Sequence, residues 1–154
     1  MHYAIRSLIK IGIEFVPVDD VNPKTVDTDY VEGAIVWSVG DVQLLSETHW
    51  DLIDQLWVYM IDGAVQFLES GTFESYFPDQ PLRLGFIRRG SNGVEVTVGE
   101  NKHIVDRQVF LASLIDGGKH FFEKMEGLVP KHKDTWRRYL NRIECSLAKH
   151  LSSH

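Results

Sequence analysis

The sequence has a single cysteine, Cys145, among its 154 residues. One chain therefore forms no internal disulfide and no cluster of thiolate metal ligands. Cys145 falls within a helical pattern of apolar residues, where a lone cysteine usually behaves as a small hydrophobic side chain. We therefore expect Cys145 to be buried.

Long apolar runs are absent as well. The longest runs fall far short of the roughly 18 residues that a membrane-spanning helix needs, and the first residues show no cleavage site behind an uninterrupted apolar stretch. Apolar residues make up 44% of the chain and charged residues 25%, as in ordinary globular proteins. We expect a cytoplasmic protein without a membrane segment.

The local signatures of catalysis are missing too. The sequence contains no glycine-rich nucleotide-binding loop, no GxSxG, no HExxH and no CxxC, so it indicates no reaction and no cofactor. The nearest pairs of metal-ligand types, His49 with Asp51 and His132 with Asp134, offer two ligands where a metal site needs three or four. We expect a non-enzymatic protein with no catalytic residue, no metal and no cofactor.

Basic residues are scarce in the first half of the chain. Residues 1–80 carry 14 acids against 3 bases, a net charge of −11, whereas residues 81–154 carry 8 acids against 13 bases, a net charge of +5. Between Glu14 and Asp79 the single base is Lys24. Two interpretations are open: the two halves complement each other within one domain, or the acidic half steers a basic partner toward the protein.

Alternation of apolar and polar residues with a period of two predicts the strands. The first strand ends at Pro17, and the acidic residues 17–30 read as a surface loop. Gly40-Asp41 and the turn RGSNG, residues 89–93, are typical of hairpin connections. The expected strands cover residues 3–16, 31–39, 42–45, 82–89, 94–98 and 102–105.

Apolar residues at three- and four-residue spacing predict a long central helix. Thr48 is the expected N-cap, Trp50 and Trp57 belong to the apolar stripe, and Gly71 ends the helix. The polar face of this helix is expected to carry three acids, which are Asp51, Asp62 and Glu69.

Two further helices follow the second hairpin. Asp106 is the expected N-cap of the first of them, and Gly117-Gly118 within it predicts a kink or a close backbone approach. Pro130 begins the last helix. The order of elements predicts a single α+β domain over residues 1–154, an antiparallel sheet of about five to six strands packed by three helices.

The central helix leads into TFESYFPDQP, residues 72–81, which we expect to form a loop. Its three aromatic residues leave two interpretations open, because they can pin the loop to the core or serve as an exposed anchor for a partner. The expected partner-binding surface combines the acids of the helix with this loop, and its residues are Asp51, Asp62, Glu69, Phe73, Tyr76, Phe77 and Asp79.

Three segments carry a resemblance to a known class of proteins. They are WDLIDQLW at Trp50–Trp57, YFPDQP at Tyr76–Pro81 and the pair Phe121-Phe122. With these segments, residues 31–130 resemble small uncharacterised bacterial proteins of the immunity-protein type, which are acidic, cytoplasmic and protect a cell from a toxin. The resemblance implies a non-catalytic inhibitor; the basic C-terminal half departs from that pattern, and no functional residue carries over.

The leading hypothesis is thus a non-catalytic binding protein that takes a basic protein partner, such as a toxin domain. The alternative is a small-molecule-binding protein or enzyme with a cleft between sheet and helices near His120 or His103. The last helix carries a basic stripe that a nucleic acid could use, but the net charge of −6 argues against that partner. An apolar stripe of the same helix could build an oligomer, so the oligomeric state stays open.

Overall fold

The structure, a computed structural model, describes residues 2–151, and these form nine strands and three α-helices. The predicted α+β class is confirmed. The strands are β1 (Tyr3–Ile11), β2 (Glu14–Pro17), β3 (Glu32–Val39), β4 (Val42–Leu45), β5 (Asp51–Leu52), β6 (Thr72–Tyr76), β7 (Arg83–Arg89), β8 (Gly93–Val98) and β9 (Asn101–Asp106). The α-helices are α1 (Ile53–Ser70), α2 (Arg107–Leu128) and α3 (Lys133–Arg142).

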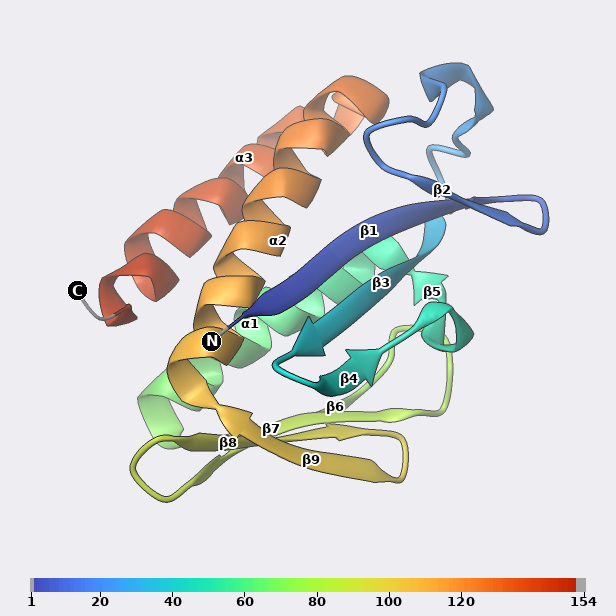
Figure 1. The fold of residues 1–154 in the computed structure, drawn as a ribbon. Coiled ribbons are helices and arrows are strands. Elements are labelled where there is room, and N and C mark those ends of the chain that lie inside the picture. Colours follow the sequence, from blue (N-terminus) through green and yellow to red (C-terminus); the bar gives the residue numbers. More distant parts are fainter. Residues whose placement is uncertain (1, 152–154) are drawn as a thin grey trace.

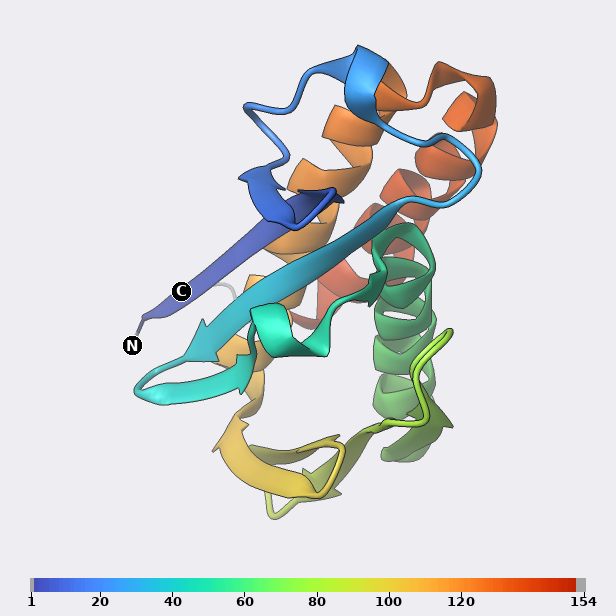
Figure 2. The same ribbon diagram turned by 90° about the vertical axis from the view of Figure 1, so that its right-hand side faces the viewer.

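The strands are divided between two antiparallel sheets, where one sheet of five to six strands was expected. The first sheet has the order β2-β1-β3-β4, with β5 also paired to β3, and the second has the order β6-β7-β8-β9. Helix α1 separates β5 from β6 along the chain, so the second half of the strands starts a sheet of its own. Figures 1 and 2 show α1 and α2 against the two sheets, with α3 packed beside α2.

One hydrophobic core connects both sheets to the helices. The Phe110 ring of α2 contacts Trp37 of β3 at a centroid distance of 5.5 Å and Phe86 of β7 at 5.0 Å. The buried indole N–H of Trp37 donates a hydrogen bond of 2.8 Å to Ser113 Oγ, so its polar atom is satisfied inside the core. Phe110 therefore links the first sheet to the inner face of the second.

The prediction of one strand over residues 3–16 is wrong. Strands β1 and β2 form a hairpin, and the turn between them contains Gly12 and Ile13. Gly12 adopts φ +63°, a left-handed conformation that glycine accepts without strain. The period of two continues across this turn, so alternation alone did not reveal the reversal.

The central helix begins later than predicted. Ser46, rather than Thr48, caps a short 3₁₀ turn at Glu47–His49, and α1 starts only at Ile53. The intervening Asp51–Leu52 pair is held extended because it pairs with β3. The predicted end is confirmed, since Gly71 has φ +84° and its N–H donates to Phe67 O at 2.7 Å.

The second half of the chain follows its prediction more closely. The hairpin β7–β8 and the last strand β9 are present, and Asp106 Oδ2 accepts a 3.0 Å hydrogen bond from Val109 N at the start of α2. A Cβ added at Gly117 would lie 2.9 Å from the Ile5 side chain. Gly117 thus allows the close approach of α2 to β1 without a break in the helix.

The C-terminal helix has an irregular end. Pro130–His132 forms a 3₁₀ turn that leads into α3, and a π-helical turn at Ile143–Leu147 follows α3 before a last 3₁₀ turn at Ala148–His150. Cys145 is exposed, so the prediction that it is buried is wrong. The wider π turn shifts the angular positions of its residues, which places Cys145 outside while Ile143 and Leu147 stay buried.

Candidate partner-binding surface

Three of the seven expected partner-binding residues are not on the surface. The exposed fractions are 2% for Asp51, 8% for Phe73 and 4% for Phe77. Asp51 precedes α1 instead of lying on its polar face, and the predicted loop begins as strand β6, which turns Phe73 inward. The structure therefore corrects the expected surface by removing these three residues.

Asp51 anchors the segment that follows β6. Its carboxylate accepts hydrogen bonds from the backbone N–H groups of Leu52 (2.6 Å), Asp79 (3.1 Å) and Gln80 (3.0 Å). The side-chain amide of Gln80 also donates to the carbonyl of Trp50. A buried carboxylate that accepts several backbone N–H bonds is well satisfied, so this acid fixes the conformation of residues 79–80.

The two buried phenylalanines, Phe73 and Phe77, pin the aromatic segment to the core, which is one of the two interpretations left open by the sequence. Phe73 packs against Phe86 at a centroid distance of 5.3 Å, and Phe77 lies 6.4 Å from the His49 ring. Burial lowers the pKa of His49, whose Nδ1 accepts a 3.0 Å hydrogen bond from Ser46 N. Tyr76, in contrast, is 55% exposed, so one of the three aromatics remains on the surface.

Asp62 has an internal partner. Its Oδ1 lies 2.8 Å from Arg142 Nε, and its Oδ2 accepts a 3.2 Å hydrogen bond from the Tyr139 hydroxyl. Burial raises the pKa of Tyr139, and the Asp62 carboxylate adds to that rise. Asp62 is half-buried, and these two contacts attach it to the C-terminal helix.

The same kind of pairing recurs across the molecule. Of the seven ion pairs among residues 2–151, four join an acid of the first half to a base of the second half. They are Asp19–His120, Asp19–Lys124, Asp29–Lys131 and Asp62–Arg142. The interpretation that the halves complement each other thus accounts for part of the charge asymmetry.

The ion pairs of Asp19 with His120 and Lys124 should make the stability of the protein fall at acid pH. His120 and then Lys124 lower the pKa of Asp19 below its ordinary value of 3.8. Its stabilising contribution is therefore complete above pH 3.8 and is lost as the pH falls through the lower folded-state value. Because Asp19 is half-exposed, we expect its ion pairs to contribute less than about 1 kcal/mol to the free energy of unfolding.

The free energies of unfolding of wild type and Asp19→Asn in urea should differ by this amount at pH 6 and converge near pH 2. Equal stability of the two proteins at both pH values would contradict the assignment.

Three further acids, in β6 or next to it along the chain, have no such partner. Glu69, Glu74 and Asp79 are exposed, and the described part of the chain gives none of them an ion pair. We call Glu69, Glu74, Tyr76 and Asp79 the acidic strip. Glu74 and Tyr76 belong to β6, an edge strand of the second sheet, whereas Glu69 lies at the end of α1 just before this strand and Asp79 lies just after it.

The acidic strip borders a sheet face that the helices leave open. Figures 1 and 2 show α1 and α2 on one side of the sheet β6–β9 and solvent on the other. On the inner side, Phe73, Phe86 and Val96 are cross-strand neighbours and are all buried. The opposite side, which we call the open sheet face, is formed by the alternate residues Glu74, Tyr76, Arg83, Gly85, Ile87, Glu95, Thr97, Lys102 and Ile104.

A groove of about 390 Å³ lies on the open sheet face. Its floor is one cross-strand row, in which Glu74 pairs with Gly85, Gly85 with Thr97 and Thr97 with Lys102. The row is hollow at its middle because Gly85 has no side chain. It has an acid at the β6 edge and a base at the β9 edge.

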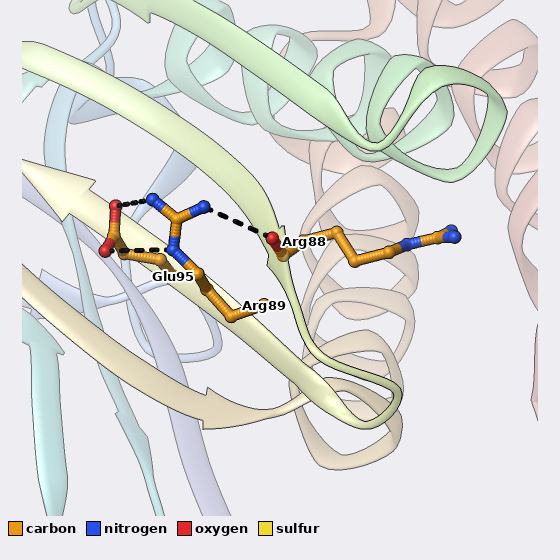
Figure 3. Close-up of polar contacts among 3 residues, drawn as sticks. All are labelled: Arg88, Arg89 and Glu95. Atoms are coloured by element: carbon orange, nitrogen blue, oxygen red, sulfur yellow. Dashed lines mark hydrogen bonds and ion pairs between the residues drawn. The ribbon is translucent and has the colours of Figure 1, made fainter.

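The residues on the two sides of this row differ in character. Tyr76 and its cross-strand neighbour Arg83 line one side, and Ile87 lines the other. Beyond Ile87, Glu95 is neutralised by Arg89, whose Nη2 lies 3.3 Å from Glu95 Oε2 (Figure 3). Ile104, 61% exposed, completes the apolar side at the β9 edge.

A second groove lies between β1 and α2 and fits the location of the expected cleft. Tyr3, Asp116 and His120 line it in two adjoining parts of about 390 and 210 Å³. Its polar groups already bind one another: the Tyr3 hydroxyl donates to Asp116 at 3.0 Å, and His120 pairs with Asp19. His103 is exposed on β9, away from this groove. The small-molecule alternative near His120 stays a prediction.

Burial raises the pKa of the Asp54 carboxyl, and hydrogen bonds from backbone N–H groups, followed by nearby His132, oppose the rise. Both residues line a groove of about 270 Å³ beside Trp136. Among residues 2–151, no group of three or more His, Cys, Asp or Glu side chains is placed to hold a metal ion. Nor does any helix in that range have the length and apolar character to cross a bilayer.

Comparisons with protein-family models, with curated proteins and with solved structures each found no match. The residues that sequence reasoning missed are those of the groove, above all Gly85, Arg83 and Lys102. The alternation of residues in the second hairpin indicated which side chains share a face. The groove itself could be recognised only from the strand register, which places Gly85 beside Thr97 and Glu74.

Proposed function

We propose that the chain is a non-catalytic cytoplasmic binding protein that takes a basic protein partner at the acidic strip, as an immunity-type inhibitor of a toxin domain would. The observation that carries the proposal is the exposure of Tyr76, 55%, together with three exposed acids in or next to β6 that have no ion pair in the described residues. Elsewhere in the acidic half, Asp19, Asp29 and Asp62 have bases beside them.

The chemistry of the strip supports this kind of partner. Tyrosine is favoured in interfaces because it contributes a large contact area at a low cost in side-chain entropy. Unpaired carboxylates attract lysine and arginine and accelerate encounter at low salt. Asp51 holds the backbone of Asp79 in place, so the strip is ordered before a partner arrives and less binding energy is lost on ordering it.

The test measures binding of the partner, captured from a native lysate, to variants of the strip. Tyr76→Ala should weaken binding roughly 30-fold, as the loss of an aromatic anchor does. Glu74→Lys should slow association about tenfold at low salt and less at high salt, where exposed charges are screened.

Two exposed residues outside the strip serve as controls. Tyr30 is 67% exposed, so Tyr30→Ala removes an aromatic of equal size, and Asp134→Lys on α3 makes the same change of charge as Glu74→Lys. Both controls should bind as wild type does. If Tyr30→Ala weakens binding as much as Tyr76→Ala, or if Tyr76→Ala has no effect, the strip is not the binding surface.

A further inference from the structure

We propose that the open sheet face is also a self-association surface that takes a second copy of this chain in a two-fold symmetric dimer. The observation behind the proposal is the order of charges along the groove floor, which runs acid, glycine, threonine, base from β6 to β9. The inference concerns the dimer itself and does not rest on the proposed function.

The row has the symmetry that such a dimer requires. Neighbouring strands are about 4.8 Å apart, so Glu74 and Lys102 lie roughly 7 Å on either side of the midline between β7 and β8. A two-fold axis along that midline, parallel to the strands, places β6 of one copy over β9 of the other. Each Glu74 then faces the Lys102 of the second copy, and the interface contains this charge pair twice.

The charges concerned are available for these contacts. Glu74 and Lys102 are both exposed, and within residues 2–151 neither has an ion pair. The other acid of this face, Glu95, is already neutralised by Arg89 (Figure 3). Glu74 and Lys102 are therefore free to form ion pairs with a second copy of the chain.

Apolar contacts and the shape of the face favour the same occupant. The dimer would cover Ile104 and Tyr76, two of the four large hydrophobic residues that are exposed in the described chain. Gly85 and Thr97 leave the centre of the face low, so the side chains at its edges can reach across. Four strands of about five residues bury on the order of 800 Å² in total, which is below the roughly 1,200 Å² of stable specific interfaces, so the dimer should be weak, with a micromolar or higher dissociation constant.

Two single variants and their mixture test this arrangement. In the homodimer of Glu74→Lys, two lysine side chains would face each other at both contacts, and in the homodimer of Lys102→Glu two carboxylates would do so. Like charges at these positions should raise the dimer dissociation constant at least tenfold in each variant. In an equimolar mixture each contact of the heterodimer joins a lysine of one variant to a carboxylate of the other, so mixing the two variants should restore the dimer.

The double variant Glu74→Lys/Lys102→Glu restores the pairing. It exchanges the acid and the base within one chain, so each contact of its homodimer again joins opposite charges. Two substitutions that each weaken the dimer should therefore restore it when they are combined, which a merely destabilising effect of either change would not do.

Sedimentation velocity from 10 µM to 1 mM at low salt gives the readout. The expected result is a dimer for wild type, monomers for each single variant, and a dimer again for the double variant. The controls Asp134→Lys and Lys149→Glu, which make the same charge changes outside the face, should behave as wild type does. A wild type that stays monomeric at 1 mM, or a double variant that dimerises no better than the single ones, would overturn the proposal.

The same variants separate this inference from the proposed function. Lys102 lies at the edge opposite the acidic strip, so Lys102→Glu should abolish the dimer and leave binding of a basic partner intact. Tyr76 and Glu74 belong to both surfaces, so the dimer and the partner should compete for them.

Discussion

Replacement of Asp51 by alanine should destabilise the protein by roughly 2 to 3 kcal/mol, a large share of the 5 to 15 kcal/mol typical of a domain. The change removes the acceptor of three backbone hydrogen bonds, from Leu52, Asp79 and Gln80. When backbone N–H donors at a partly buried site lose a charged acceptor, the protein loses more stability than it does when a surface contact is removed. For a chain of this size the melting temperature should fall by about 5 to 10 °C.

Asp51→Asn is the matched variant for this prediction. It has nearly the same shape and keeps one acceptor oxygen, but its amide group faces backbone donors, so it should lose about half as much stability. Asp41→Ala, at the exposed β3–β4 turn, should change stability by less than about 0.5 kcal/mol. If Asp51→Ala unfolds in urea at the same midpoint as Asp41→Ala, the anchoring role of this carboxylate is wrong.

The second large effect is expected at Gly63, where α1 meets β6. A Cβ added at Gly63 would lie 2.4 Å from Cε2 of the Phe73 ring, and Phe73 is packed against Phe86. The ring therefore has to shift within a dense core. Alanine gains about 1 kcal/mol of helix propensity over glycine, but the displacement outweighs it, and Gly63→Ala should cost about 2 kcal/mol net.

Gly127 provides the control for Gly63. It also lies in a helix, α2, and nothing stands within 4 Å of a Cβ added there. Gly127→Ala should be neutral or stabilising by up to about 1 kcal/mol. Chemical denaturation of both variants measures the difference, and a Gly63→Ala protein as stable as Gly127→Ala would show that α1 and β6 are not in contact as described.

The sequence predicted those elements whose stabilising contacts are local. The cap at Asp106 bonds to Val109, Gly71 bonds to Phe67, and both were predicted from nearby residues. Asp51 is different, because its partners Asp79 and Gln80 lie 28 and 29 residues away. A helical spacing around Asp51 was visible, but the strand pairing that keeps it out of the helix was not.

The aromatic segment shows the same limit. Pro78 and Pro81 indicated a loop over residues 72–81, and this obscured the alternation in TFESY that makes β6 a strand. With the strand recognised, Phe73 and Tyr76 fall on opposite faces, and the two interpretations of the aromatics apply to different residues. The groove required more still, since it depends on the register of four strands.

The sequence predicted the overall balance of charge between the two halves of the chain, but not which residues form ion pairs. The excess of acids in one half and bases in the other indicated that the halves attract each other, and four ion pairs now join them. Composition did not reveal which acids are left over. Among the acids that the structure leaves without ion pairs in its described part are Glu69, Glu74 and Asp79, which lie in β6 or next to it along the chain.

The most direct test of the acidic strip as a partner-binding surface is site-specific photocrosslinking. A photoreactive phenylalanine analogue replaces Tyr76 in one protein and Tyr30, an exposed tyrosine away from the strip, in another. Both are irradiated in native lysate at low and high salt. Position 76 should crosslink to one basic protein at low salt, with less product at high salt, and position 30 should not. Equal products from both positions, or none at 76, would contradict the account.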